Sequence, residues 1–201
     1  MFQFLLIYIS FLSHFSKVFD IAWAHRPDVF ATAGADGSIR MFDLRHLEHS
    51  TIIYELGVPD SPSTKPLLRL SWNQVDRNCL ATIAMDGSVV TLLDIRAPSR
   101  AVGRLQGHVK AVNAIDWAPH TSSHICSGGN DSRVLVWDTT KVSASSSTSG
   151  VSSALSSTST KVCEPLLCCS VEEEVSNVAW APMQHEWMAV AVGSTVKALH
   201  I

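Results

Sequence analysis

Three residue types used in acyl-transfer chemistry occur close together in this chain: His108, Ser127 and Asp131. A serine nucleophile, a histidine base and a carboxylate that orients the histidine form the catalytic triad of many hydrolases. The local sequence argues against that chemistry, because no Gly-x-Ser-x-Gly nucleophile elbow surrounds Ser127. A structural hydrogen-bond network that also includes Trp137 is the better explanation of these residues.

Other side chains that could support chemistry are isolated or lack partners. His120 and His124 lie in a predicted loop, where we expect solvent-exposed side chains rather than a catalytic pair. The five cysteines show no paired spacing, and we expect Cys79 and Cys126 to be small strand residues in a reducing compartment. The other three are Cys163, Cys168 and Cys169. No second Cys or His group has metal-ligand spacing, so the sequence predicts no metal, no cofactor and no enzyme activity.

The elements that would position these side chains repeat along the chain. Each copy has a strand ending in Trp, a strand of small residues, an Asp turn, and a strand ending in Asp. The strand-end tryptophans are Trp23, Trp72 and Trp117, and the turn aspartates are Asp36, Asp86 and Asp131. The closing pairs are Phe42-Asp43, Leu93-Asp94 and Trp137-Asp138. A fourth, degenerate copy runs from Val175 to Ile201, with Trp180 in its first strand.

Composition limits the function classes. The chain has 201 residues, of which 46% are hydrophobic and 16% charged, so one domain with a sizeable core is expected. The formal net charge is −3, and basic runs are absent, which argues against direct nucleic-acid binding.

Two segments differ from the repeats. Residues 1–16 are mostly apolar, and three explanations remain: a truncated or misread start, a real signal or anchor, or a strand that completes a blade. The run is short for a membrane span, which needs about 20 residues, and no membrane is expected. Residues 142–161 are rich in Ser and Thr and cannot bury enough apolar surface to order themselves, so we predict a disordered insertion between blades.

Gly107-His108 followed by Trp137-Asp138 is the signature of one β-propeller blade. Further segments resemble one particular family: Val18–Trp23, Ala35–Arg45, His49–Glu55, Pro66–Leu70 and Asn113–Ile115. They are similar to the WD-repeat family that includes the plant TRANSPARENT TESTA GLABRA and light-regulated WD proteins and the animal cullin-ligase-associated factor. The resemblance implies an all-β WD-repeat β-propeller, here about four blades of a seven-bladed ring. The expected blades are about 17–56, 66–105, 106–141 and 162–201.

The resemblance implies a non-catalytic scaffold in the nucleus and cytoplasm. Its partners would be Myb or basic helix-loop-helix transcription factors, or DYRK-type kinases. The alternative is a substrate receptor of a cullin-RING ubiquitin ligase. The Asp-x-Arg endings, Asp43 with Arg45 and Asp94 with Arg96, are similar to the box by which such receptors dock their adaptor, although a solvated strand end would give the same residues. His108, Ser127, Asp131 and Trp137 are similar to the structural tetrad of WD blades.

Four repeats are little more than half of such a ring. The sequence therefore looks like an N-terminally truncated copy. A C-terminal fragment, a misannotated gene product, and a part that completes itself with another copy remain open as explanations.

Overall fold

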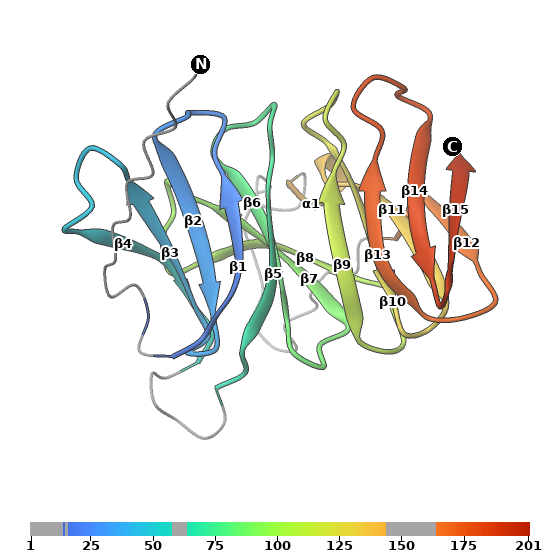
Figure 1. Ribbon diagram of the computed structural model, residues 1–201, viewed down its shortest axis with the longest axis horizontal. Helices are drawn as coiled ribbons and strands as arrows, with labels where there is room; N and C mark the ends of the chain where they lie inside the picture. The colour runs from blue at the N-terminus through green and yellow to red at the C-terminus, as the bar shows by residue number, and fades with distance from the viewer. Residues whose placement is uncertain (1–13, 15, 58–63, 144–163) are drawn as a thin grey trace, which may run out of the picture.

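The chain forms four antiparallel β-sheets, and each sheet is built from strands that follow one another in the sequence. The computed structural model describes residues 14, 16–57, 64–143 and 164–201. The sheets follow chain order across the molecule, with the first sheet at one end and the fourth sheet at the other (Figure 1). The arrangement is a partial β-propeller, which confirms the predicted fold class, and the sheets are named blades 1 to 4 in chain order.

Blades 1 to 3 have four strands and blade 4 has three, each blade beginning with its inner strand. Blade 1 contains β1 (Val18–Trp23), β2 (Val29–Gly34), β3 (Ser38–Asp43) and β4 (Ser50–Glu55). Blade 2 contains β5 (Leu67–Trp72), β6 (Cys79–Ala84), β7 (Val89–Asp94) and β8 (Ala101–Gln106). Blade 3 contains β9 (Val112–Trp117), β10 (His124–Gly129), β11 (Arg133–Asp138) and β12 (Leu167–Ser170). Blade 4 contains β13 (Val175–Trp180), β14 (Trp187–Val192) and β15 (Thr195–His200).

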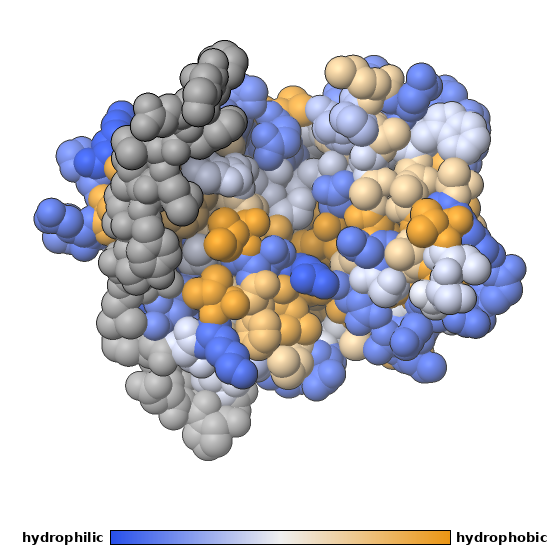
Figure 2. All heavy atoms as spheres, in the orientation of Figure 1, coloured by the Kyte–Doolittle hydropathy of each residue, from blue (hydrophilic) through white to orange (hydrophobic). Residues whose placement is uncertain are grey.

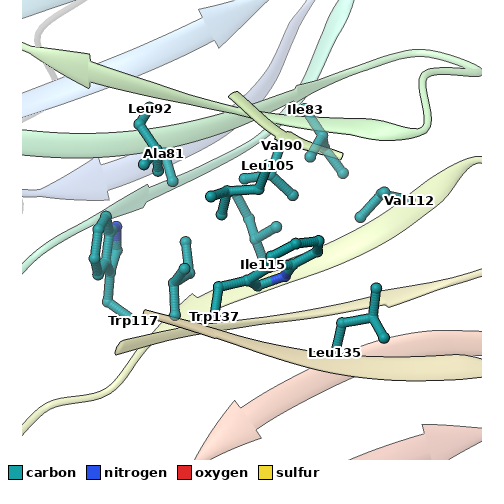
Figure 3. Packing of buried hydrophobic residues seen from close by; sticks show 11 residues of the cluster. Ala81, Ile83, Val90, Leu92, Leu105, Val112, Ile115, Trp117, Leu135 and Trp137 are labelled. Atoms are coloured by element: carbon teal, nitrogen blue, oxygen red, sulfur yellow. The ribbon is translucent and has the colours of Figure 1, made fainter. Parts of the chain in front are cut away.

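The core is a series of apolar layers between neighbouring blades. Successive side chains of a strand point to opposite faces of its sheet, so a middle blade contributes alternate residues to two layers. In β11, Leu135 and Trp137 pack toward blade 2, whereas Val134 and Val136 pack toward blade 4. Figure 3 shows the layer between blades 2 and 3, in which side chains from the two sheets face each other. This two-sided burial explains why the strands are apolar on both faces.

Polar side chains also join adjacent blades close to the inner strands. The Asp20 carboxylate accepts the Leu70 N–H at 2.8 Å, which joins blade 1 to blade 2. The Asp116 carboxylate accepts the Trp180 N–H at 2.9 Å, which joins blade 3 to blade 4. Burial raises the pKa of Asp116, although the N–H groups of Trp180 and Trp117 partly offset this effect.

The strand-end tryptophans show how each blade depends on its predecessor. Trp72, Trp117 and Trp180 pack in the layer between their own blade and the one before it, and each is at most 8% exposed. Trp23 is 50% exposed, because no blade precedes blade 1 in the part of the chain that the structure describes. Other apolar residues of β1, among them Ile21, are also exposed, and hydrophobic residues gather in the middle of the face shown in Figure 2.

The Ser-rich segment interrupts blade 3 and does not separate two blades. Strand β12 pairs with β11 and completes the third sheet, so Leu167–Ser170 does not belong to the fourth blade as predicted. Most of the predicted insertion lies outside the described residues. Its first two residues end a short helix, α1 (Thr140–Ser143), and Val142 packs against the layer between blades 2 and 3.

The turns that contain the predicted turn aspartates differ in which residue adopts the left-handed backbone conformation. In blade 1 the left-handed residue is Gly37, with φ of 73°, as expected for Asp36-Gly37. In blade 2 it is Asp86, with φ of 55°, and Gly87 is not left-handed. In blade 3 the left-handed residue is Ser132, with φ of 58°. The left-handed residue is therefore the glycine in the first turn and the aspartate itself in the second.

The predicted N-terminal extension lies outside the described residues, except for His14 and Ser16. Among the described residues, no helix has the length and apolar composition that crossing a membrane requires.

Candidate functional site

The structure brings the four residues of the predicted blade 3 network into contact. His108 Nδ1 lies 3.0 Å from Asp131 Oδ1, and His108 Nε2 lies 2.8 Å from Ser127 Oγ. The Trp137 indole N–H donates to the same Ser127 Oγ at 2.8 Å. Because a carboxylate only accepts hydrogen bonds, Nδ1 carries the ring proton and Nε2 accepts the Ser127 hydroxyl proton. The network joins the segment before β9 to β10, to β11 and to the turn between them.

This network has the order of a Ser-His-Asp triad but cannot act as one. His108 is 7% exposed and Ser127 is 0% exposed, so a substrate cannot approach the hydroxyl. The Trp137 N–H also occupies Ser127 Oγ. Burial raises the pKa of Asp131, but hydrogen bonds from the Val109 N–H and the His108 ring outweigh it, so the pKa lies below its usual value. The arrangement is a buried polar brace.

Blade 1 contains a second network that the sequence reasoning missed. His14 Nδ1 lies 2.9 Å from Asp36 Oδ1, and His14 Nε2 lies 2.7 Å from Thr32 Oγ1. Phe42 occupies the place of Trp137, so this network has no indole N–H. His14 precedes the predicted start of the blades at residue 17, yet its ring is buried among blade 1 side chains.

Residue spacing could have revealed His14. His14 and Asp36 are 22 residues apart, and His108 and Asp131 are 23 residues apart. Blade 2 lacks such a contact among the described residues, and its Thr82 hydroxyl donates to the carbonyl of Arg69 at 2.8 Å.

The two Asp-x-Arg endings form the same exposed turn on adjacent blades. In blade 1, the Arg45 N–H donates to Asp43 Oδ1 at 2.9 Å, and Arg45 Nε donates to the same oxygen at 2.8 Å. In blade 2, the Arg96 N–H donates to Asp94 Oδ1 at 2.8 Å, and Arg96 Nη2 donates to Asp94 Oδ2 at 2.6 Å. Each guanidinium is held along one edge by the carboxylate two residues before it.

Both arginine side chains are largely exposed to solvent. The side chains of Arg45 and Arg96 are 57% and 67% exposed. Hydrogen bonds from Arg45 hold the pKa of Asp43 well below its usual range, and Arg96 lowers the pKa of Asp94 in the same way. Arg45 Nε also lies 3.1 Å from Asp28 Oδ2. Exposed ion pairs contribute little to stability, so the main effect of these contacts is to orient the guanidinium groups.

The third blade keeps this turn but not its arginine. The Asp138 carboxylate accepts the Thr140 N–H at 3.0 Å and the Thr140 hydroxyl at 2.6 Å. The Asp therefore shapes the turn, and the Arg is an addition found in blades 1 and 2.

The remaining candidates do not come together in a reactive site among the described residues, and Cys163 lies outside them. His120 is not a solvated loop residue as predicted: its ring stacks on His185 at 4.4 Å and meets Trp180 edge-on. Burial, followed by the nearby charges of His185 and His124, lowers the pKa of His120. The four cysteines in the described ranges are free, and burial raises the pKa of Cys79 to about 11. No group of three or more His, Cys, Asp or Glu side chains in these ranges could hold a metal ion.

Comparison with known proteins identifies the same repeats. The model of the WD domain, G-beta repeat, matches residues 7–43 and 99–138, which include the two buried histidine networks. The chain is 45% identical over 190 residues to the DDB1- and CUL4-associated factor 7 homolog of Dictyostelium discoideum, covering 94% of this chain and 52% of that protein.

Two fungal proteins also match. The chain is 33% identical to an uncharacterized WD repeat-containing protein of Schizosaccharomyces pombe, covering 94% of this chain and 52% of that protein. It is 30% identical to a WD repeat-containing protein of Saccharomyces cerevisiae, covering 94% of this chain and 46% of that protein. The chain thus spans about half the length of the curated relatives it matches.

Proposed function

We propose that this WD-repeat protein is a non-catalytic receptor. It would dock an adaptor of a cullin-RING ubiquitin ligase. The observation that carries the proposal is the pair of equivalent, exposed Asp-x-Arg turns on adjacent blades. The similarity to a protein named as associated with DDB1 and CUL4 supports the same conclusion. In this proposal the buried networks hold the blades, and the turns meet the adaptor.

The geometry of the turns suits recognition of backbone carbonyl or carboxylate oxygens. A planar guanidinium offers donors on two edges, and its own aspartate occupies only one of them. An arginine that is already oriented loses less conformational entropy on binding than a free one. Two such groups on neighbouring blades provide two fixed points of attachment.

We expect the double substitution Arg45→Ala with Arg96→Ala to weaken adaptor binding at least tenfold. Truncation of an interface arginine can cost about 2 kcal/mol or more, whereas the same change on a free surface alters stability by about 0.5 kcal/mol or less. The measurement is the Kd of the full chain for the purified DDB1-type adaptor. Arg104→Ala with Arg133→Ala is the matched control, because both of these arginines are exposed on other strands.

Asp43→Asn with Asp94→Asn separates orientation from charge. Asn keeps an oxygen that can accept the turn N–H, but it no longer pairs ionically with the arginine. A loss of adaptor affinity in this variant that is smaller than the loss in the arginine variant would support the orienting role of the carboxylates. Adaptor affinity that is unchanged in the arginine variant, at normal expression and melting temperature, would remove the ligase proposal.

The second candidate function is a scaffold for transcription factors or kinases. Under that proposal, the arginine variant would still co-precipitate such a partner. Retention of these partners with loss of the adaptor would show that the turns serve the ligase alone.

A further inference from the structure

A cleft of about 480 Å³ lies between blades 1 and 2, on the side of the two Asp-x-Arg turns. Asp43 of the first turn lines it, and so does Ile95, which lies between Asp94 and Arg96 of the second. The other lining residues belong to strands β2 to β5 and to the segments that follow β1, β3 and β5. Its volume falls in the range of binding pockets, about 300–1,000 Å³.

The floor of the cleft is apolar and only partly covered. Ala24, Met41 and Ile95 are half-buried and pack against the layer between blades 1 and 2. Phe42 and Trp72 also line the cleft and are almost fully buried. The half-buried side chains would lose further contact with water if an apolar group entered the cleft, which is favourable.

The rim is basic and rich in hydrogen-bond donors. The residues of this rim are His25, Arg26, His46, His49 and Arg77. Arg26 already pairs with Asp28 at 2.9 Å. Arg77 is exposed, and the structure shows no ion pair for its guanidinium within the described ranges.

The carboxylate of Asp43 does not cancel this character. Asp43 lines the cleft, but its oxygens accept hydrogen bonds from Arg45. The cleft therefore joins an apolar floor to a rim on which Arg77 has no ion pair with any described residue.

We propose that this cleft binds an acidic peptide segment that carries a large apolar side chain. The apolar side chain would cover Met41 and Ile95, and a carboxylate next to it in the peptide would pair with Arg77. Arginine is well suited to a carboxylate, because its fork can bind both oxygens. The proposal goes beyond adaptor docking and does not depend on it.

A peptide fits the site better than a nucleic acid. Nucleic-acid sites neutralise several phosphates with Lys and Arg, whereas no Lys is among the described residues that line this cleft, and the chain carries a net charge of −3. A phosphodiester backbone would also offer no apolar group to cover the half-buried Met41 and Ile95 of the floor.

Selection from a random dodecapeptide phage library on the immobilised full chain tests the proposal. We expect the selected peptides to be enriched in Asp and Glu around a large apolar residue. A synthetic copy of the most enriched peptide should bind Arg77→Glu at least tenfold more weakly and Met41→Ala several-fold more weakly. Arg77→Lys should retain most of the affinity. Arg104→Glu, which reverses an exposed charge elsewhere on blade 2, should bind like the unaltered chain.

Each opposite result would overturn the proposal. The first is that the selected peptides are not enriched in Asp and Glu. The second is that the unaltered chain selects peptides no better than the Arg77→Glu chain does. The third is that the synthetic peptide binds the Arg77→Glu and Arg104→Glu chains with equal affinity. Displacement of the peptide by a twelve-nucleotide single-stranded DNA would instead assign the cleft to phosphodiesters. Binding of the DDB1-type adaptor to the Arg77→Glu chain is measured in parallel and shows whether the adaptor site is intact. This measurement distinguishes failure of the peptide proposal from failure of the adaptor proposal.

Discussion

Replacement of His108 by Ala is expected to lower the free energy of unfolding by about 3 kcal/mol. The change removes a ring that bonds to both Ser127 and Asp131 in the interior of blade 3. A buried polar group left without its partner costs about 1–3 kcal/mol, and more if it is charged. The Asp131 side chain is 5% exposed, so water cannot fully replace the lost contact.

Chemical denaturation monitored by tryptophan fluorescence measures this effect. Trp137→Phe removes one donor while keeping the apolar ring, and a loss of about 1 kcal/mol is expected for one hydrogen bond. The control is His200→Ala, because the His200 side chain is 56% exposed, its ion pair is with an exposed Glu186, and its ring meets the exposed Trp187 only edge-on at the surface. A loss below 1 kcal/mol for His108→Ala would contradict the role of the brace.

Acid should weaken the same brace. The pKa of Asp131 is lowered in the folded chain, so the Asp131 contribution to stability is present above the ordinary carboxyl pKa. It is lost as the pH falls through the lower folded value. The unaltered chain should therefore lose more stability below the ordinary pKa, which is about 4, than the His108→Ala variant does.

The second large effect is expected from Gly128→Ala, which we predict to destabilise the chain by about 2–3 kcal/mol through overpacking. A Cβ at this position would lie 2.3 Å from Val175 Cγ1 and 3.0 Å from Val178 Cγ1. Gly128 belongs to β10 of blade 3, and both valines belong to β13 of blade 4. The extra methyl group would push the two blades apart.

A double-mutant cycle with Val175→Ala tests this mechanism. Val175→Ala alone should also destabilise the chain, because it empties part of a packed layer. The double variant should be more stable than the sum of the two single effects by about 1 kcal/mol, since residues in contact couple by about 0.5–3 kcal/mol. Strict additivity would show that the methyl group does not meet Val175.

The repeat predicted most strands because the same apolar pattern recurs in every blade, and three layers between the four blades bury it. The repeat did not predict the position of Leu167–Ser170. A strand of four residues after a Ser-rich segment could equally end one copy of the repeat or begin the next. Pairing with β11 is a long-range contact that decides between them. The buried ring of His14 was missed for a similar reason, since the apolar residues around it obscured its spacing from Asp36.

The candidate site was only partly predictable. The two Asp-x-Arg endings could be identified from residue order alone. The pairing of Arg45 with both Asp43 and Asp28, in contrast, depends on how the loop after β1 folds back. The cleft between blades 1 and 2 could not be found in the sequence, because its lining residues come from stretches that are far apart along the chain.

The position of the Ser-rich segment between two strands of one sheet has a consequence for evolution. Strands β11 and β12 must find each other across residues 139–166, and the entropy of closing such a connection grows only with the logarithm of its length. Doubling the connection would cost about 0.6 kcal/mol, which is less than the expected loss from one buried side chain. Natural selection can therefore lengthen, shorten or rewrite this connection, except at its ends, where Val142 packs against the core and the Leu166 N–H donates to Val136. Regulatory sequences can be gained there while the propeller keeps its shape.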